Sequence, residues 1–236
     1  MSESQSDAPG KAGDLVRRHR LSTRLWHWTN ALAVLVMLMS GLMIFNAHPR
    51  LYWGEAGANH DPAWLQIGST RSGEGVLALG DMRLRTTGVL GISGGEERAF
   101  PRFATLPSYY SLASARLWHM AFAWLLAAAW IAILPRALSA LVRPRPDYNA
   151  GQRFAYPLVQ LVLLPAMIWT GLAMAPGMDA AWPFLTEWLG GRQTARSIHF
   201  IVAFALLAFT LGHIALWLRS DPLGRLKAMT LGGGRP

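Results

Sequence analysis

Four of the seven histidines lie inside or at the ends of long apolar stretches, where an ionisable side chain is costly unless it has a function. They are His27, His119, His199 and His213. His199 and His213 are 14 residues apart, which in an α-helix is roughly 40° from the same face and about 21 Å further along the axis. One helix would therefore present two imidazoles to the same side at two depths, an arrangement suited to two metal centres.

The apolar stretches that carry these histidines have the length of membrane-spanning helices. They cover residues 25–45, 117–134, 154–175 and 198–218, and tryptophans flank their ends. Each is close to the ~20 residues that a helix needs to cross a hydrocarbon core of about 30 Å. Any one of them could be a buried helix of a soluble protein, but four together predict an all-α integral membrane protein.

We expect a four-transmembrane-helix up-down bundle over residues 21–218, with a long outer loop at about 46–116 between helices 1 and 2. The connecting segments differ in charge. Residues 1–24, 135–153 and 219–236 carry 13 Lys or Arg against 5 Asp or Glu, whereas the remaining connections carry 9 against 8. By the positive-inside rule the first set is cytoplasmic, so both termini are expected in the cytoplasm.

The two chain ends are short and polar. Residues 1–20 are rich in Ser, Asp, Gly and Ala without periodicity, which predicts a disordered N-terminus. Residues 219–236 are expected to form a cytoplasmic C-terminal tail. The net charge of +9 is explained by this topology, and no nucleic-acid partner is expected.

The predicted topology pairs the four histidines by depth. Helix 1 enters from the cytoplasm with His27 in its first turn, and helix 2 enters from outside with His119 in its first turn. His27 therefore meets His213 on the cytoplasmic side, and His119 meets His199 on the outer side. Imidazoles that face each other across a bundle core are what bis-histidine ligation needs, so the sequence predicts two haem b groups.

The residue types around these histidines narrow the chemistry. The chain has no cysteine, which excludes disulfides, thiolate sites, iron–sulfur ligands and covalent c-type haem attachment. Zinc or copper is the alternative to haem, but two histidines without carboxylate or sulfur neighbours make a poor site for either. A cofactor-free transporter or assembly protein with proton-relay histidines would be expected to carry carboxylates within its spans, and the four stretches contain none.

An arginine precedes three of the candidate ligands by three residues, one helical turn toward the water. These are Arg24, Arg116 and Arg196. A haem propionate points toward the aqueous surface, where an arginine fork binds a carboxylate through two hydrogen bonds. We therefore predict that these arginines bind propionates, with snorkelling at helix ends as the simpler alternative.

Small and amide side chains suggest two further roles. Gly41 and Gly171 lie near the outer ends of helices 1 and 3 and would leave room for a macrocycle, although ordinary small-residue helix packing explains them equally well. Asn30 and Gln160 are candidate quinone contacts. Membrane helices often carry amides that are satisfied within the protein, which is the alternative for both.

The outer loop at 46–116 contains Gly- and Ser-rich stretches and a partly alternating patch at 89–92, which predicts a short hairpin. A connection of this length is usually functional or disordered. Its mixed charges are accompanied by the aromatic residues Tyr52, Trp53, Trp64, Tyr109 and Tyr110. We expect a periplasmic redox protein to dock on it.

Several motifs in this pattern are shared with a known family. They are Arg24-Leu25-Trp26-His27-Trp28, Ser40-Gly41-Leu42, Arg116-Leu117-Trp118-His119, and Arg196-Ser197-Ile198-His199 followed by His213. Together they resemble the bacterial cytochrome b561 and nickel–iron hydrogenase cytochrome b family, which includes the gamma subunits of membrane formate dehydrogenases. The 14-residue histidine spacing is the most specific element of the resemblance.

The resemblance implies a multi-pass protein of the bacterial inner membrane with a four-helix core and two b haems. It also implies electron transfer between a periplasmic redox partner and quinone that exchanges near the cytoplasmic haem. The long outer loop and the absence of a fifth helix favour a molybdopterin oxidoreductase as that partner. The alternative within redox chemistry is a stand-alone superoxide:quinone oxidoreductase, against which the long loop weighs. A homodimer is left open.

Overall fold

The computed structural model describes residues 16–17, 20–142 and 150–234. The chain divides into two compact units. The larger is Asn30–Phe209, and the smaller combines Met1–Thr29 with Thr210–Pro236. The predicted disorder at 1–20 falls mostly on residues outside the described part of the chain.

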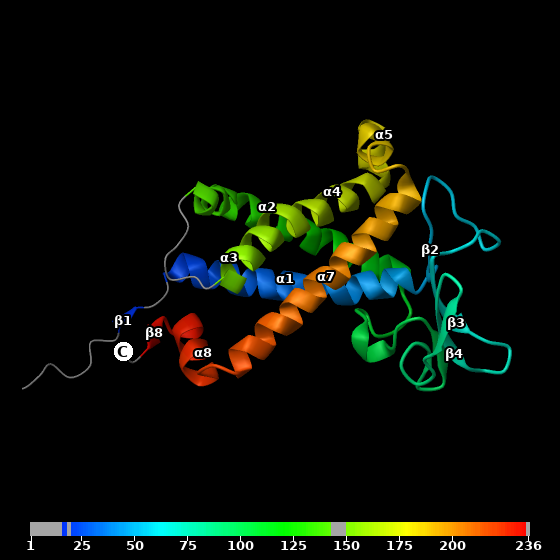
Figure 1. Ribbon diagram of the computed structural model, residues 1–236, viewed down its shortest axis with the longest axis horizontal. Coiled ribbons are helices and arrows are strands. Elements are labelled where there is room, and N and C mark those ends of the chain that lie inside the picture. Colours follow the sequence, from blue (N-terminus) through cyan, green and yellow to red (C-terminus); the bar gives the residue numbers. More distant parts are fainter. Residues whose placement is uncertain (1–15, 18–19, 143–149, 235–236) are drawn as a thin grey trace, which may run out of the picture. The chain divides into compact units, whose positions relative to one another are not determined.

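Long helices dominate the structure (Figure 1). They are α1 Leu21–Phe45, α2 Leu112–Val142, α7 Arg192–Leu218, and a third span built from α3 Ala150–Pro157, the π-helix η2 Leu158–Leu163 and α4 Leu164–Met174. Within the described residues, four helical spans are thus long and apolar enough to cross a membrane by length and composition. The predicted four-span helical architecture is confirmed.

The spans are longer than the apolar stretches that predicted them. Helix α2 begins at Leu112 and continues through Pro135 to Val142, whereas the apolar stretch covers only residues 117–134. An apolar stretch ends at the first charged side chain, here Arg136. The helix tolerates this charge because a long arginine side chain at a helix end reaches water while its stem stays on apolar surface.

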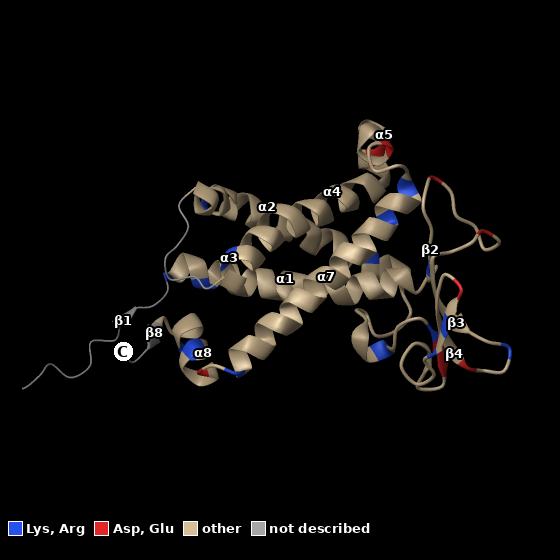
Figure 2. Ribbon diagram, in the orientation of Figure 1, with Lys and Arg blue, Asp and Glu red and all other residues tan. Residues whose placement is uncertain are grey.

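The surfaces of these helices are apolar. In the apolar 18-residue segment of α7 only 6% is buried within the protein, and in the corresponding segment of α2 only 11%. Leu117, Ile131 and Leu216 are each more than half exposed. Figure 2 shows charged residues at the helix ends and over the connection between α1 and α2, which we call the outer connection after its predicted side of the membrane. The middle of each long helix is uncharged. Apolar surface of this extent indicates contact with lipid.

Within Asn30–Phe209 the helices share one apolar core. Its buried members come from all four spans and are Ala33, Leu126, Leu164, Met167, Val202 and Leu206. The third span is distorted where it joins this core, because Pro165 has no amide hydrogen and would clash with a carbonyl in a regular α-helix. The π-helix immediately before Pro165 relieves that clash by widening the turn. Within it, the carbonyl of Gln160 accepts a 2.7 Å hydrogen bond from Nε1 of Trp130 in α2.

The outer connection is folded, and its sheet was not predicted. Strands β2 Arg50–Leu51, β3 Leu65–Ser69, β4 Gly75–Leu79 and β5 Met82–Arg85 form an antiparallel sheet in that order. Strands β6 Gly91–Ser93 and β7 Glu96–Arg98 form a separate hairpin, followed by the short helix η1 Arg102–Ala104. The hairpin expected around residues 89–92 is therefore present, displaced by a few residues. The fold is mostly helical rather than purely α.

A second apolar cluster fixes the sheet to the helices. Leu51, Leu65 and Ile67 from the sheet pack with Phe45 at the end of α1, and Phe200 of α7 packs against the same cluster. The sheet thus lies at the end of the bundle where α1 ends and α7 begins (Figure 1). The short helices α5 Pro176–Ala181 and α6 Phe184–Glu187 form the connection between α4 and α7.

The smaller unit is formed by the two chain ends. Strand β1 Val16–Arg17 pairs with β8 Gly233–Gly234, and α8 Pro222–Thr230 precedes β8. The carboxylate of Asp221 caps the start of α8 by accepting a 3.0 Å hydrogen bond from the amide of Gly224. The predicted C-terminal tail therefore contains a capped helix.

Candidate metal centres

The first candidate centre is the pair predicted to lie on the outer side, His119 of α2 and His199 of α7, which we call the outer pair. Their ring centroids are 6.2 Å apart and the ring planes are inclined by 58°. Both residues are only partly accessible and belong to the unit Asn30–Phe209. The structure therefore brings together the two histidines that sequence reasoning paired on the outer side.

The second candidate centre is the inner pair, His27 of α1 and His213 of α7. Their ring centroids are 6.3 Å apart with an inclination of 50°, and Trp28 lies edge-on to His27 at 5.2 Å. His213 is exposed in the isolated chain. The two histidines of the second predicted pair are therefore also adjacent, and one of them, His213, lies on the surface of the helices.

The separation within each pair fits a single metal ion between the rings. Two metal–nitrogen bonds of about 2 Å, plus about 1.2 Å from each ring centre to its nitrogen, give about 6.4 Å. The observed 6.2 and 6.3 Å agree with this sum. Among the described residues there is no group of three or more His, Cys, Asp or Glu that could hold a metal ion. Two axial imidazoles without further protein ligands suit haem, in which the porphyrin supplies the remaining donors.

A hydroxyl group holds each ring of the outer pair. The Oγ of Ser40 in α1 is 3.0 Å from Nδ1 of His119, and Oγ1 of Thr170 in α4 is 2.8 Å from Nδ1 of His199. Each hydroxyl is followed in sequence by a glycine of the same helix, Gly41 or Gly171. These contacts leave Nε2 of each ring as the nitrogen available to a metal.

The two glycines lie against the histidine rings. A Cβ atom at Gly41 would approach Cε1 of His119 to 3.2 Å, and one at Gly171 would approach Cε1 of His199 to 3.6 Å. The glycines therefore give the imidazoles room beside α1 and α4. Their predicted role in making room for a macrocycle remains a prediction.

Two of the three predicted propionate ligands contact backbone carbonyls in the structure. Arg196 donates to the carbonyls of His48 and Arg50, and Arg24 donates to those at the end of α8. Arg116 is exposed. Propionate binding by the three arginines remains a prediction, with a competing structural role now visible for Arg24 and Arg196.

The candidate quinone contacts lie on α1 and on the third span. Asn30 follows His27 by three residues in α1. Gln160 lies in the π-helix, a local distortion that often accompanies functional sites. Quinone contact at these two amides remains a prediction.

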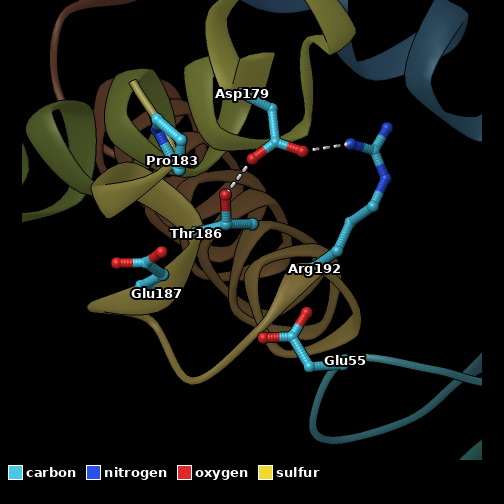
Figure 3. Close-up of a pocket in the computed structure, with 6 residues that line it drawn as sticks. All are labelled: Glu55, Asp179, Pro183, Thr186, Glu187 and Arg192. Atoms are coloured by element: carbon cyan, nitrogen blue, oxygen red, sulfur yellow. Dashed lines mark hydrogen bonds and ion pairs between the residues drawn. The ribbon is translucent and has the colours of Figure 1, made fainter. Parts of the chain in front are cut away.

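A surface hollow near the start of α7 is a separate feature (Figure 3). It is lined by Glu55, Asp179, Pro183, Thr186, Glu187 and Arg192. Asp179 accepts a hydrogen bond from Thr186 of α6 and pairs with Arg192 of α7 at 3.4 Å. The hollow has no histidine in its lining, and its contacts brace α5 and α6 against α7.

Sequence reasoning missed Ser40 and Thr170 as partners of the outer histidines. The available signal was a hydroxyl residue immediately before each of the two glycines that it did single out. Which way those hydroxyls point depends on the rotation of α1 and α4 about their axes. The sequence alone does not determine that rotation.

The fold and the histidine pairs define the class of this protein, a membrane-spanning helical bundle that presents facing imidazoles between its spans. The chain belongs to the prokaryotic cytochrome b561 family, whose sequence pattern matches residues 18–232. The family predicted from the motifs is thereby confirmed. Membership implies b-type haem and a role as a membrane electron-transfer cytochrome.

Three proteins to which this chain is similar are named as subunits of redox complexes. The chain is 29% identical over 195 residues to a putative protein-methionine-sulfoxide reductase subunit, YedZ1, of Azospira oryzae, covering 82% of this chain and 86% of the relative. It is 26% identical over 225 residues to a probable Ni/Fe-hydrogenase B-type cytochrome subunit of Cupriavidus necator, covering 92% and 85% respectively. A similarly named subunit of Rhizobium leguminosarum bv. viciae is 25% identical over 212 residues, covering 86% and 80%. No solved structure matches the chain.

Proposed function

We propose that this chain is the di-haem cytochrome b subunit of a membrane oxidoreductase, and that it transfers electrons between a periplasmic redox partner and the quinone pool. The observation that carries the proposal is the pair of facing histidine couples, each with a ring separation that fits one iron. When bound, each haem supplies one-electron exchange between ferric and ferrous iron. His119 and His199 would hold the outer haem, and His27 and His213 the inner one.

The proposed orientation places both termini in the cytoplasm of a bacterial cell and the protein in its inner membrane. The support is the basic excess in residues 1–24, 135–153 and 219–236. The folded connection between α1 and α2 then lies on the periplasmic side, next to the outer pair. Residues 143–149, within the central basic segment, are outside the described part of the chain.

The periplasmic partner would dock on this connection. Trp53 is 55% exposed and stacks on Trp64 at 5.6 Å with an inclination of 18°. Nε1 of Trp64 donates a 2.9 Å hydrogen bond to Oγ of Ser197, two residues before His199 in α7. An exposed aromatic residue joined in two contacts to the helix of a haem ligand supports electron entry at this surface.

The proposed partner is a separate redox protein, of which we propose the class. Relatives are named as hydrogenase and methionine-sulfoxide reductase subunits, so a separate redox subunit is expected. The long folded connection favours a molybdopterin oxidoreductase. Quinone exchange is proposed near the inner pair, with Asn30 and Gln160 as the residues to examine first.

The test is a reduced-minus-oxidised spectrum of the purified chain together with its haem content. We expect b-type absorption and about two haems per chain, with oxidation of the reduced protein by a soluble quinone. One haem per chain would overturn the di-haem assignment. A spectrum without b-type absorption would overturn haem binding and favour the alternative function, a transporter or assembly protein with proton-relay histidines. Rapid haem reduction by enzymatically generated superoxide would instead favour the stand-alone superoxide:quinone oxidoreductase.

A further inference from the structure

We propose that Ser40 and Thr170 are positioning residues of the outer centre, which fix His119 and His199 as Nδ1–H tautomers and lower the redox potential of the haem they hold. This inference rests on the proposed function, because it presumes a haem between these two rings. Ser40 belongs to one of the motifs quoted above, but neither the motifs nor the names of the relatives give Ser40 or Thr170 a role at the site.

The direction of each hydrogen bond follows from the single proton of a hydroxyl group. Oγ of Ser40 is 2.6 Å from the carbonyl of Val36, and Oγ1 of Thr170 is 2.6 Å from the carbonyl of Ala166. A carbonyl oxygen accepts only, so each hydroxyl donates its proton to its own helix. The hydroxyl oxygen can then only accept from the histidine.

The accepted proton must be carried by Nδ1 of each imidazole. A neutral imidazole has one protonated and one unprotonated nitrogen, so Nε2 of His119 and of His199 keeps its lone pair. That lone pair is the group that a metal needs. The hydroxyls therefore favour the ligating tautomer before any haem is bound, together with the backbone carbonyls of Met37 and Met167, which also accept from His119 and His199 respectively.

Burial makes this arrangement rigid. Ser40 is fully buried and Thr170 is 1% exposed. Water therefore cannot replace the histidine as the partner of either hydroxyl, and in such surroundings each hydrogen bond is electrostatically stronger than in water. Because α1 supplies one hydroxyl and α4 the other, each ring of the outer pair is held by a neighbouring helix and not by its own.

A hydrogen bond from Nδ1–H raises the basicity of the ligating Nε2. A more basic ligand stabilises ferric iron more than ferrous iron, so the hydroxyls lower the potential of the outer haem. Removing a hydroxyl should raise that potential and leave the inner haem unchanged. General damage to the helix bundle would instead be expected to change the potentials of both haems.

The experiment is a potentiometric titration of the purified full-length protein carrying Ser40→Ala, Thr170→Val or both. At a fixed ambient potential within the titration range, we expect the ratio of ferric to ferrous outer haem to fall about threefold in each single variant. In the double variant we expect about tenfold, which is ~59 mV for a one-electron couple. The second redox component should not move.

Two conservative variants and one matched control complete the design. Ser40→Thr and Thr170→Ser keep the hydroxyl and should restore the wild-type potential. Ser139→Ala removes a hydroxyl of α2 that also bonds to its own helix, at 2.9 Å from the Arg136 carbonyl, and should change neither potential. Unshifted potentials in Ser40→Ala and Thr170→Val at full haem loading would overturn the inference. Equal loss of haem in Ser40→Ala and Ser40→Thr would also overturn the inference. A wild-type protein without haem would instead overturn the proposed function.

Discussion

Nη1 of Arg196 donates a 3.0 Å hydrogen bond to the carbonyl of Arg50, and Nη2 donates to the carbonyl of His48. The same guanidinium lies 5.6 Å from the centre of the Phe45 ring. Arg196, near the N-terminal end of α7, thus ties this helix to the segment that follows α1. This tether holds the beginning of the outer connection about one turn before the proposed ligand His199.

Loss of this tether should loosen the outer connection. In Arg196→Gln we expect the amides of residues 48 and 50–52 to exchange about tenfold faster, equivalent to about 1.4 kcal/mol, because charge-assisted hydrogen bonds to two carbonyls are lost. Hydrogen exchange read by mass spectrometry measures this. Arg116→Gln, at the corresponding position before His119, is the control and should leave this segment unchanged. If hydrogen exchange were unaltered but the redox potential of the outer haem were shifted, Arg196 would act on a propionate instead.

Removal of single ligands should separate the two centres. We expect His119→Ala and His199→Ala each to reduce the haem content from about two per chain to about one and to eliminate the same redox component. His27→Ala and His213→Ala should eliminate the other component. Haem content and potentiometry measure both effects.

The remaining histidines provide the controls for that experiment. His48 and His60 belong to the outer connection, and neither is paired with another histidine across the described helices. Alanine at either position should leave both haems in place. Two haems in His119→Ala would contradict the pairing.

Alanine should have different effects at the two glycines of the outer centre. Each substitution gains about 1 kcal/mol of helix propensity. At Gly171 the new Cβ would lie at an ordinary 3.6 Å from the His199 ring, so Gly171→Ala should stabilise the protein. Loss of haem in this variant would instead support the role predicted for Gly171 in making room for a macrocycle. At Gly41 it would lie at 3.2 Å from His119, so the ring must shift and Gly41→Ala should lose haem. Thermal unfolding and haem content measure the difference, and equal behaviour of the two variants would contradict it.

The four spans and the histidine pairs could be predicted because length, hydropathy and charge asymmetry are properties of the sequence itself. The pairing needed only an orientation and an even number of helices. The β2–β5 sheet could not be predicted in the same way. Its strands are at most five residues long, and they are held by contacts with Phe45 and with Phe200, of which Phe200 is far away in the sequence.

The side-chain partners were harder to predict for a related reason. Arg24 and Arg196 were assigned to propionates because of their spacing from the histidines. In the structure, however, distant parts of the chain fold back and present carbonyls to them. The hydroxyls of Ser40 and Thr170 reach the histidines only because α1 and α4 have a particular rotation. Spacing along one helix is recorded in the sequence, whereas the rotation of two helices against each other results from packing.

His48 should make the outer connection sensitive to acid. Burial, and then the positive charges of Arg196 and Arg50, lower its pKa below 6.5, and its buried Nε2 has no hydrogen-bond partner among the described residues. Below about pH 6.5 His48 binds a proton in the opened segment but stays neutral in the folded segment. Protonation therefore favours the opened segment, so the stability of the folded segment decreases as the pH falls below about 6.5. Exchange of the amides of residues 48 and 50–52, corrected for intrinsic rates, should therefore accelerate by up to about tenfold between pH 7.5 and 5.5. His48→Gln should abolish this dependence and the exposed control His60→Gln should retain it. The same slope in both variants would assign the effect to another group.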